Sequence, residues 1–338
     1  MLKGDGSVWG AGSSQYGQLG TQSSSKTKSF KMLIKGDVRA VAAGSYFSLV
    51  VKRDDSLWGT GFNNLGQLGL PLATRVASSF KKLVDGDVKA VAAGASHTLL
   101  LKRDSSLWSA GSNVYGQLGD SYRQREGFAM VITTGVKAMA AGMRHSLVLK
   151  LDGSLWATGR NVHGQLGKED ITKTSEFVKV ISKDVVAVAA GGIHSMVLKR
   201  DGSVWATGNN KYGALGSGDT DECKEFMMVI PDSAQAVAAG STFSLVLKEN
   251  GDLWGAGMNN LGQFGYKYRQ STVTPFTIVS SNVLDVSAGD AQTIILKVDG
   301  SVWATGKNFN GQLGVGTAVN LARFTKVPRV DTSSSGRV

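Results

Sequence analysis

Apolar residues fall into four short runs within a unit of about 49 residues, and residues 184–230 show the pattern most clearly. The first run, 185–190, is rich in alanine and ends at a glycine, and the second, 194–198, is continuously apolar after a histidine and a serine. An Asp-Gly pair at 201–202 is typical of a tight hairpin turn, because both residues tolerate positive φ angles. The third run, 203–208, contains a tryptophan, and the fourth, 226–230, ends before a proline. Four short antiparallel strands are the content of one propeller blade.

This unit recurs along the whole chain. The seven tryptophans lie 48 to 50 residues apart, at positions 9, 58, 108, 156, 205, 254 and 303, and a Gly-Gln-Leu-Gly-like loop follows each one. A fixed period of this length is typical of a repeat architecture. A helical solenoid is disfavoured, because the 44 glycines, the many β-branched residues and the lack of a 3.6-residue apolar period do not suit helices. We therefore predict an all-β fold, a seven-bladed β-propeller.

The first blade is incomplete in this sequence. The tryptophan strand occurs seven times, but the alanine-rich strand occurs six times, ending at Gly44, Gly94, Gly142, Gly191, Gly240 and Gly289. We predict six four-stranded blades plus an N-terminal half-blade, in which residues 1–3 continue a second strand. Because open strand edges favour aggregation, we expect either a fragment or a gap that a partner fills. The propeller spans 1–328, with third strands at 7–12, 56–61, 106–111, 154–159, 203–208, 252–257 and 301–306, and a polar tail follows at 329–338.

Composition narrows the class of protein. No apolar run has the length of a membrane span, so no membrane association is expected. The single cysteine, Cys223, excludes an internal disulfide framework, and the few residues before the first repeat leave no room for a signal peptide. We expect a cytoplasmic or nuclear protein. The formal net charge of +11 indicates an acidic partner surface.

Two repeated features invite a chemical role, and we expect a structural role for both. The glycine-rich loops, such as 59–66, lack the spacing of a phosphate-binding loop and a following helix. We expect the repeated glutamine of these loops, such as Gln165, to hydrogen-bond loop backbone. His97, His145 and His194 occupy one equivalent position, but Phe47, Phe243 and Gln292 fill it in other repeats, which no metal site would accept. We predict no catalytic residue, no metal and no cofactor.

Charge is distributed unevenly between the hairpins and the loops. A lysine two residues before an aspartate recurs at nearly every hairpin, as at Lys150 and Asp152, and we expect a solvated rim with partly compensated charge there. The excess positive charge lies in loops after Gly-Gln-Leu-Gly, at Lys26, Lys28, Lys31, Lys81, Lys82, Arg123, Arg125, Lys267, Arg269, Arg323 and Lys326. One loop is acidic instead, with Asp219, Asp221, Glu222 and Glu225. Such a lopsided ring can orient a partner electrostatically.

The repeat resembles that of the regulator of chromosome condensation family. The resemblance rests on Ala-Ala-Gly-x-x-His-Ser-Leu-Val-Leu at 140–149 and on Asp-Gly-Ser-Leu-Trp-Ala-Thr-Gly-Arg-Asn-Val-His-Gly-Gln-Leu-Gly at 152–167. It covers residues 1 to about 330 and implies a seven-bladed propeller. Members of this family include a nucleotide exchange factor for a nuclear small GTPase and several proteins with unrelated roles, so the fold alone does not decide function. The exchange factor carries a β-hairpin insertion, for which the near-constant repeat spacing leaves no room.

Strand alternation brings variable residues to one end of the propeller. Loops between first and second strands and between third and fourth strands must emerge at the same end, opposite the Lys-Asp hairpins. Aromatic and basic residues on loops above a rigid scaffold are typical of a protein-binding face. We predict partner contacts from Tyr16, Tyr46, Phe47, Phe62, His97, Tyr115, Arg144, His145, Arg160, His163, Ile193, His194, Lys211, Phe243 and Phe309.

The sequence therefore predicts a non-enzymatic monomer that binds another protein through this face. The resemblance keeps a second function open, guanine nucleotide exchange on a small GTPase. A third is chromatin or nucleic-acid association, which the charge of +11 motivates. Without a motif that reads a groove or interleaved aromatics that stack on bases, we expect that charge to give only a weak, salt-sensitive attraction.

Overall fold

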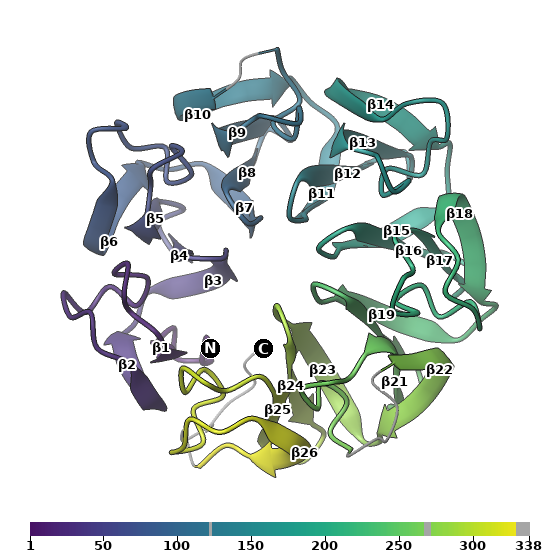
Figure 1. Ribbon diagram of the computed structural model, residues 1–338. Coiled ribbons are helices and arrows are strands. Elements are labelled where there is room, and N and C mark those ends of the chain that lie inside the picture. Colours follow the sequence, from purple (N-terminus) through teal and green to yellow (C-terminus); the bar gives the residue numbers. More distant parts are fainter. Residues whose placement is uncertain (122–123, 267–271, 329–338) are drawn as a thin grey trace.

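Seven sheets are arranged radially around a central axis in a computed structural model that describes residues 1–121, 124–266 and 272–328 (Figure 1). In this described part of the chain, six sheets have four strands, one has two, and there is no helix. The predicted all-β propeller with six complete blades and an N-terminal half-blade is confirmed. The tail at 329–338, Arg123, Lys267, Arg269 and the side chain of Arg125 lie outside the described residues.

The blades follow one another in chain order, and each complete blade runs from its innermost to its outermost strand (Figure 1). Blade 1, the half-blade, is β1 (Val8–Gly12) and β2 (Thr27–Ile34). Blade 2 is β3 (Val38–Ala43), β4 (Phe47–Lys52), β5 (Leu57–Phe62) and β6 (Val76–Val84). Blade 3 is β7 (Val88–Ala93), β8 (His97–Lys102), β9 (Leu107–Ser112) and β10 (Gln124–Ile132). Blade 4 is β11 (Val136–Ala141), β12 (His145–Lys150), β13 (Leu155–Arg160) and β14 (Lys173–Ile181).

The remaining three blades repeat the same order. Blade 5 is β15 (Val185–Ala190), β16 (His194–Lys199), β17 (Val204–Gly208) and β18 (Cys223–Ile230). Blade 6 is β19 (Ala234–Ala239), β20 (Phe243–Lys248), β21 (Leu253–Met258) and β22 (Thr272–Ser280). Blade 7 is β23 (Val283–Ala288), β24 (Gln292–Lys297), β25 (Val302–Gly306) and β26 (Leu321–Lys326). Each third strand begins one residue later than the range expected from the sequence.

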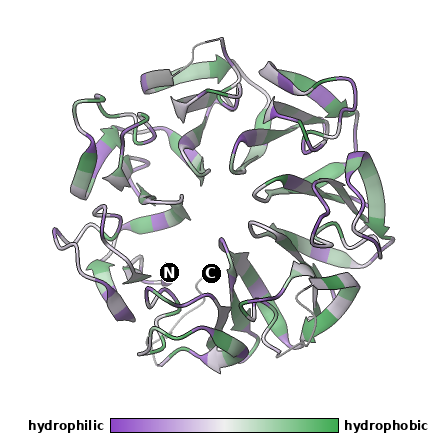
Figure 2. Ribbon diagram, viewed as in Figure 1, coloured by the Kyte–Doolittle hydropathy of each residue, from purple (hydrophilic) through white to green (hydrophobic). Residues whose placement is uncertain are grey.

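The tryptophan of each four-stranded blade packs against the preceding blade. Trp58 of blade 2 joins a cluster with Val8 and Ile34 of blade 1, and Trp108 of blade 3 joins one with Phe47 of blade 2. The core is therefore a set of clusters between neighbouring blades, and the hydrophobic colouring in Figure 2 is most continuous along the strands. A sheet buried on both faces needs apolar side chains on both, which explains the unbroken apolar runs.

Hydroxyl bonds from the next blade hold six of the seven Gly-Gln-Leu-Gly-like loops of the described residues. The Ser195 hydroxyl of blade 5 donates to the Gln165 carbonyl of blade 4 at 2.6 Å, and Thr207 donates to the Gly164 carbonyl at 2.8 Å. The Gln165 side-chain oxygen accepts from the His163 backbone N–H at 3.0 Å, as expected from the sequence. Equivalent serine or threonine bonds join Ser48 to Gln18, Thr98 to Gln67, Ser146 to Gln117 and Ser244 to Ala214.

The half-blade closes the ring against blade 7. Leu2 forms an antiparallel β-bridge with Val8 of β1, and the backbone N–H of Trp9 donates to the Met1 carbonyl at 2.8 Å. Residues 1–3 therefore do continue a second strand. Met1 and Phe30 pack into the cluster that contains Val302 and Leu313 of blade 7. The half-blade therefore lies beside blade 7 and completes the ring.

Replacing Trp156 with alanine should destabilise the fold by about 3 kcal/mol, because a large side chain wedged against blade 3 is lost and a cavity remains. Urea unfolding followed by circular dichroism measures this difference. Leu151→Ala is the matched control in the same blade, since Leu151 is 62% exposed, and it should change stability by less than about 0.5 kcal/mol. Equal effects of the two substitutions would contradict the wedge.

Candidate functional site

Two sets of loops meet at one end of the propeller, which we call the variable-loop face. The backbone N–H of Arg160, at the end of the third strand of blade 4, donates to the Arg144 carbonyl in the loop before the second strand, at 2.9 Å. Gly159 makes this approach possible, because it has a φ of 111° and a Cβ there would lie 2.5 Å from the Arg144 oxygen. The same bond joins Phe62 to Tyr46, Asn209 to Ile193 and Lys307 to Ala291. The two loop sets thus share one end, as the strand count predicts.

Three sequence positions meet on this face wherever a blade is followed by a four-stranded blade, and we call them a seam triplet. The first is the residue before the Gly-Gln-Leu-Gly loop of one blade, such as Tyr115. The second and third belong to the next blade: the residue before its second strand, such as Arg144, and the residue after the last glycine of its third strand, such as Arg160. Since the same backbone bond joins the second and third positions in all six four-stranded blades, the chemistry of a seam depends on these side chains.

The seam between blades 1 and 2 is aromatic. Tyr16 lies edge-on to Tyr46 and to Phe62, with ring centroids 5.1 Å apart in both pairs, and Tyr46 lies 6.3 Å from Phe62. Tyr46 is nevertheless 51% exposed. Edge-to-face packing fixes the three rings in place, so the exposed part of Tyr46 is presented by a pre-ordered cluster.

The seam between blades 3 and 4 combines one tyrosine with two arginines. The guanidinium carbons of Arg144 and Arg160 lie 4.9 and 5.4 Å from the centroid of the Tyr115 ring. Both contacts are of the cation–π kind, which stabilises a guanidinium over an aromatic face. Within the described residues, neither arginine forms an ion pair with a carboxylate.

The seam between blades 4 and 5 is polar and carries the opposite sign. His163 Nδ1 and Glu222 Oε1 lie 2.7 Å apart, and the Asn209 amide donates to the same Glu222 oxygen at 2.9 Å. Ile193, the second member of this triplet, is half-buried. The acidic loop of blade 5 therefore reaches the seam and is anchored there.

The remaining predicted surface residues also lie on the variable-loop face. Phe309 is 59% exposed in the loop after β25, and Lys211 is exposed with its ammonium 5.8 Å from the Tyr212 ring centroid. Ten of the fifteen predicted contact residues thus lie on this face with at least part of the side chain accessible: Tyr16, Tyr46, Phe62, Tyr115, Arg144, Arg160, His163, Ile193, Lys211 and Phe309. Whether they contact a partner stays a prediction.

The other five predicted contact residues are buried, which corrects the prediction for them. Phe47, His97, His145, His194 and Phe243 are at most 1% exposed. Each begins the second strand of its blade, and there the side chain points into the junction with the next blade instead of outward. A partner on the surface cannot touch these side chains in this structure.

The three buried histidines bond to serines of the following blade. His97, His145 and His194 Nε2 lie 2.9, 3.0 and 2.9 Å from the hydroxyls of Ser146, Ser195 and Ser244. Each serine already donates its proton to a loop carbonyl, so it accepts from the histidine, and Nε2 carries the imidazole proton. Burial lowers the pKa of His97 and His194 to about 4, and burial with the neighbouring histidines lowers the pKa of His145 to about 3.

The repeated lysines and aspartates of the opposite end lie at an exposed rim, where each also has partners within its own blade. Lys199 Nζ lies 3.7 Å from the Trp205 ring centroid, and the same contact recurs at Lys3, Lys52 and Lys102. The aspartate two residues on accepts from a serine, as Asp201 does from Ser203 at 2.6 Å, which holds the pKa of Asp201 below its usual range. That serine hydroxyl accepts from the tryptophan N–H at 3.0 Å.

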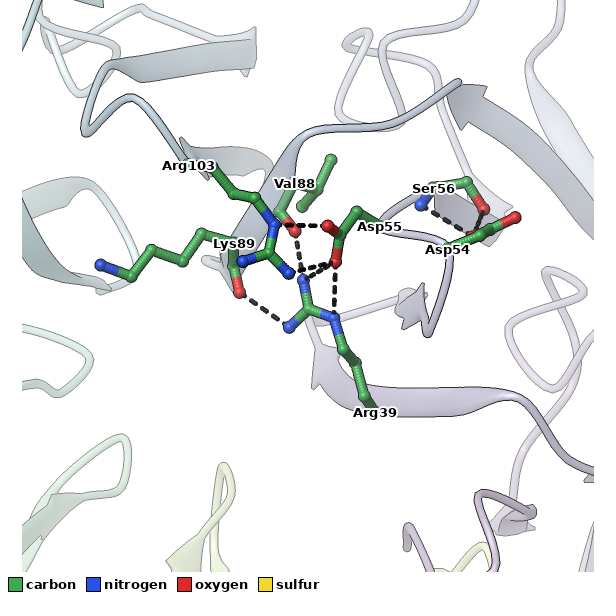
Figure 3. Close-up of polar contacts among 7 residues, drawn as sticks. All are labelled: Arg39, Asp54, Asp55, Ser56, Val88, Lys89 and Arg103. Carbon is green, nitrogen blue, oxygen red and sulfur yellow. Dashed lines mark hydrogen bonds and ion pairs between the residues drawn. The ribbon is translucent and has the colours of Figure 1, made fainter.

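An arginine pair at this end shares one internal carboxylate (Figure 3). Asp55 accepts from Arg39 Nε at 3.0 Å and from Arg103 Nη2 at 2.9 Å, and Arg39 also donates to the Val88 and Lys89 carbonyls of blade 3. These bonds, led by the one from Arg103, hold the pKa of the Asp55 carboxyl below its usual range. The two arginines tie blades 2 and 3 together and have their anion within the chain.

Sequence reasoning missed Asn209 and Glu222, and it also missed the Lys307–Asp290 ion pair at 2.9 Å. The reversed charge of the loop at 219–225 was a visible signal for Glu222. The repeat pattern does not show that the acidic loop of blade 5 crosses the junction to blade 4. This crossing brings Glu222 to His163.

Family models match most of the chain. An RCC1-like domain matches residues 87–337, and regulator of chromosome condensation (RCC1) repeats match residues 5–51 and 38–67. The chain belongs to the RCC1 repeat family. This confirms the family resemblance seen in the sequence.

Three solved structures share the fold over nearly the whole chain. Human WBSCR16 superposes with a TM-score of 0.86 at 21% identity, covering 97% of this chain and 95% of that one. Yeast RCC1 (Prp20) bound to Kap60 gives 0.88 at 19% identity, with 98% and 86% covered. Prp20p of Saccharomyces cerevisiae, described with its binding to Gsp1p and histones, gives 0.87 at 20% identity, with 98% and 88% covered. A search of curated protein sequences gave no significant match. No helix in the described residues could cross a membrane.

Acid should destabilise the propeller through the buried histidines. In the folded chain the pKa values of these histidines are about 3 to 4, below the ordinary 6.5. Between pH 6.5 and pH 4 the histidines therefore bind protons in the unfolded chain but not in the folded chain. Their stabilisation is full above pH 6.5 and is lost as the pH falls toward 4, by up to about 3 kcal/mol for each histidine. Urea unfolding between pH 7 and pH 4.5 measures this slope.

His145→Phe is the matched variant, since phenylalanine fills the equivalent position at Phe47 and Phe243. It should unfold with a shallower pH dependence than the native chain. An unchanged slope would show that His145 does not titrate on unfolding.

Proposed function

We propose that this protein is a non-enzymatic propeller that binds another protein through its variable-loop face. The observation that carries the proposal is the place of the exposed aromatic residues. Among the large hydrophobic residues that are exposed in the described part of the chain, Tyr46 and Phe309 are the aromatic ones, and both lie on this face. Aromatic side chains dominate the binding energy of many protein interfaces.

The chemistry of the seams supports the same proposal. Three of the seams are aromatic, arginine-rich and acidic on one repeated backbone frame, so the face offers different groups around the ring. A partner of low symmetry can use such differences to fix its orientation. At the opposite end, the lysines, aspartates and serines repeat the same contacts from blade to blade, which serves the blade itself.

Guanine nucleotide exchange on a small GTPase is the second candidate. It is supported by membership of the RCC1 repeat family and by the binding to Gsp1p described for the yeast relative. Chromatin or nucleic-acid association is a third, supported by the charge of +11 and by the histone binding of that relative. For all three we expect a monomer in the cytoplasm or the nucleus.

Affinity capture with matched variants tests the proposal. Tyr46→Ser with Phe309→Ser should reduce the captured partner at least tenfold, because both exposed rings on the variable-loop face are removed. Leu151→Ser with Val298→Ser removes two side chains of similar exposure, 62% and 64%, from the opposite hairpins and should change capture less than twofold. Quantitative mass spectrometry of the retained proteins is the measurement.

The three functions give different results. Equal losses with both variant pairs would contradict binding through the variable-loop face. A captured GTPase whose nucleotide is released faster by the native chain would favour the exchange function. Tight DNA binding that falls steeply between 50 and 200 mM salt would favour the nucleic-acid function.

A further inference from the structure

The arginine seam between blades 3 and 4 brings two positively charged side chains to one aromatic ring. Two guanidiniums lie over one tyrosine ring, within 4.9 and 5.4 Å of its centroid, although like charges repel. Lys173 adds a third positive charge, since it lies directly opposite Arg160 in the register of β13 and β14. No carboxylate among the described residues forms an ion pair with these three side chains.

The opposite end of the molecule shows how the chain satisfies an arginine pair internally. Arg39 and Arg103 converge on the carboxylate of Asp55, which both bind (Figure 3). An arginine fork matches the two oxygens of a carboxylate and binds it more strongly than a neutral acceptor. The pair at Arg144 and Arg160 has the cations of such a site without the anion.

We propose that Arg144 and Arg160 together bind an aspartate or glutamate carboxylate on an acidic segment of the partner protein. This proposal rests on the proposed function and names the chemistry that this part of the face recognises. The Tyr115 ring holds both arginine heads in place, which lowers the conformational entropy lost on binding.

The surroundings favour a short acidic segment over a long polyanion. Glu222 lies on the neighbouring seam with the loop of Asp219 and Asp221, so a continuous phosphate backbone that crosses both seams would meet like charge. Val114 and Met143, each next to a member of the arginine triplet, are 51% and 38% exposed. They provide an apolar contact beside the carboxylate, which suits an acidic residue followed by an aliphatic one.

Fluorescence anisotropy with three labelled peptides tests this proposal. The peptides share a Gly-Ser background and carry Glu-Leu-Glu, Gln-Leu-Gln or a version with two phosphoserines in place of the glutamates. The native chain should bind the glutamate peptide at least tenfold more tightly than the glutamine peptide. Arg144→Gln with Arg160→Gln should abolish that preference, because the charge is removed while a planar polar head remains over Tyr115.

Lys26→Gln with Lys28→Gln is the matched control, since both lysines are exposed and the net charge falls by the same amount. This control should keep the preference within twofold. Arg160→Lys keeps the charge but loses the fork, and it should weaken the glutamate peptide at least threefold. It also provides a readout if the double arginine variant does not fold, as thermal unfolding would reveal.

Four results would overturn the inference: no preference for the glutamate peptide, a preference that survives in the arginine variant, an equal loss in the lysine variant, or phosphopeptide binding more than tenfold tighter. The proposed function fails separately, through the capture experiment with Tyr46 and Phe309. A native-like capture with the arginine variant would therefore reject the carboxylate site and leave the protein-binding function intact.

Discussion

The hydroxyl bond between one blade and the loop of its neighbour is the interaction on which this structure depends. Ser195 and Thr207 of blade 5 donate to the Gln165 and Gly164 carbonyls of blade 4, and six of the seven junctions in the described residues have at least one such bond. The bonds are buried and made to backbone, so an unpaired group there would be costly. They place each loop at a fixed height over the next blade and thereby create the seams.

A uniform frame leaves the seam side chains free to differ. The backbone bond from Arg160 to Arg144 is the same as that from Phe62 to Tyr46, yet one seam is cationic and the other aromatic. Stability resides in the repeated bonds and the tryptophan wedges, whereas recognition would reside in residues that the frame does not need. This separation is common in propellers and other repeat proteins, in which a rigid scaffold carries variable binding residues.

The fold could be predicted closely from the sequence because the same strand pattern recurs seven times along the chain. The six glycines that end alanine-rich strands, against seven tryptophan strands, predicted the half-blade. Strand alternation predicted that both loop sets lie at one end. It failed at His97, His145 and Phe243, because a residue next to a loop can point outward or into the junction, and the spacing is the same in both cases. It also missed Glu222 and Asp55, whose partners lie 59 and 48 residues away in neighbouring blades. Such contacts depend on how blades are aligned, which a pattern within one repeat does not contain.

Hydrogen exchange of the protein with and without its captured partner tests the central claim most directly, that recognition belongs to the seams of one face. The account predicts added protection in the loops at 44–46, 142–144 and 160–163, with no change in the hairpins at 150–154 and 199–203. Protection confined to the hairpins would contradict it.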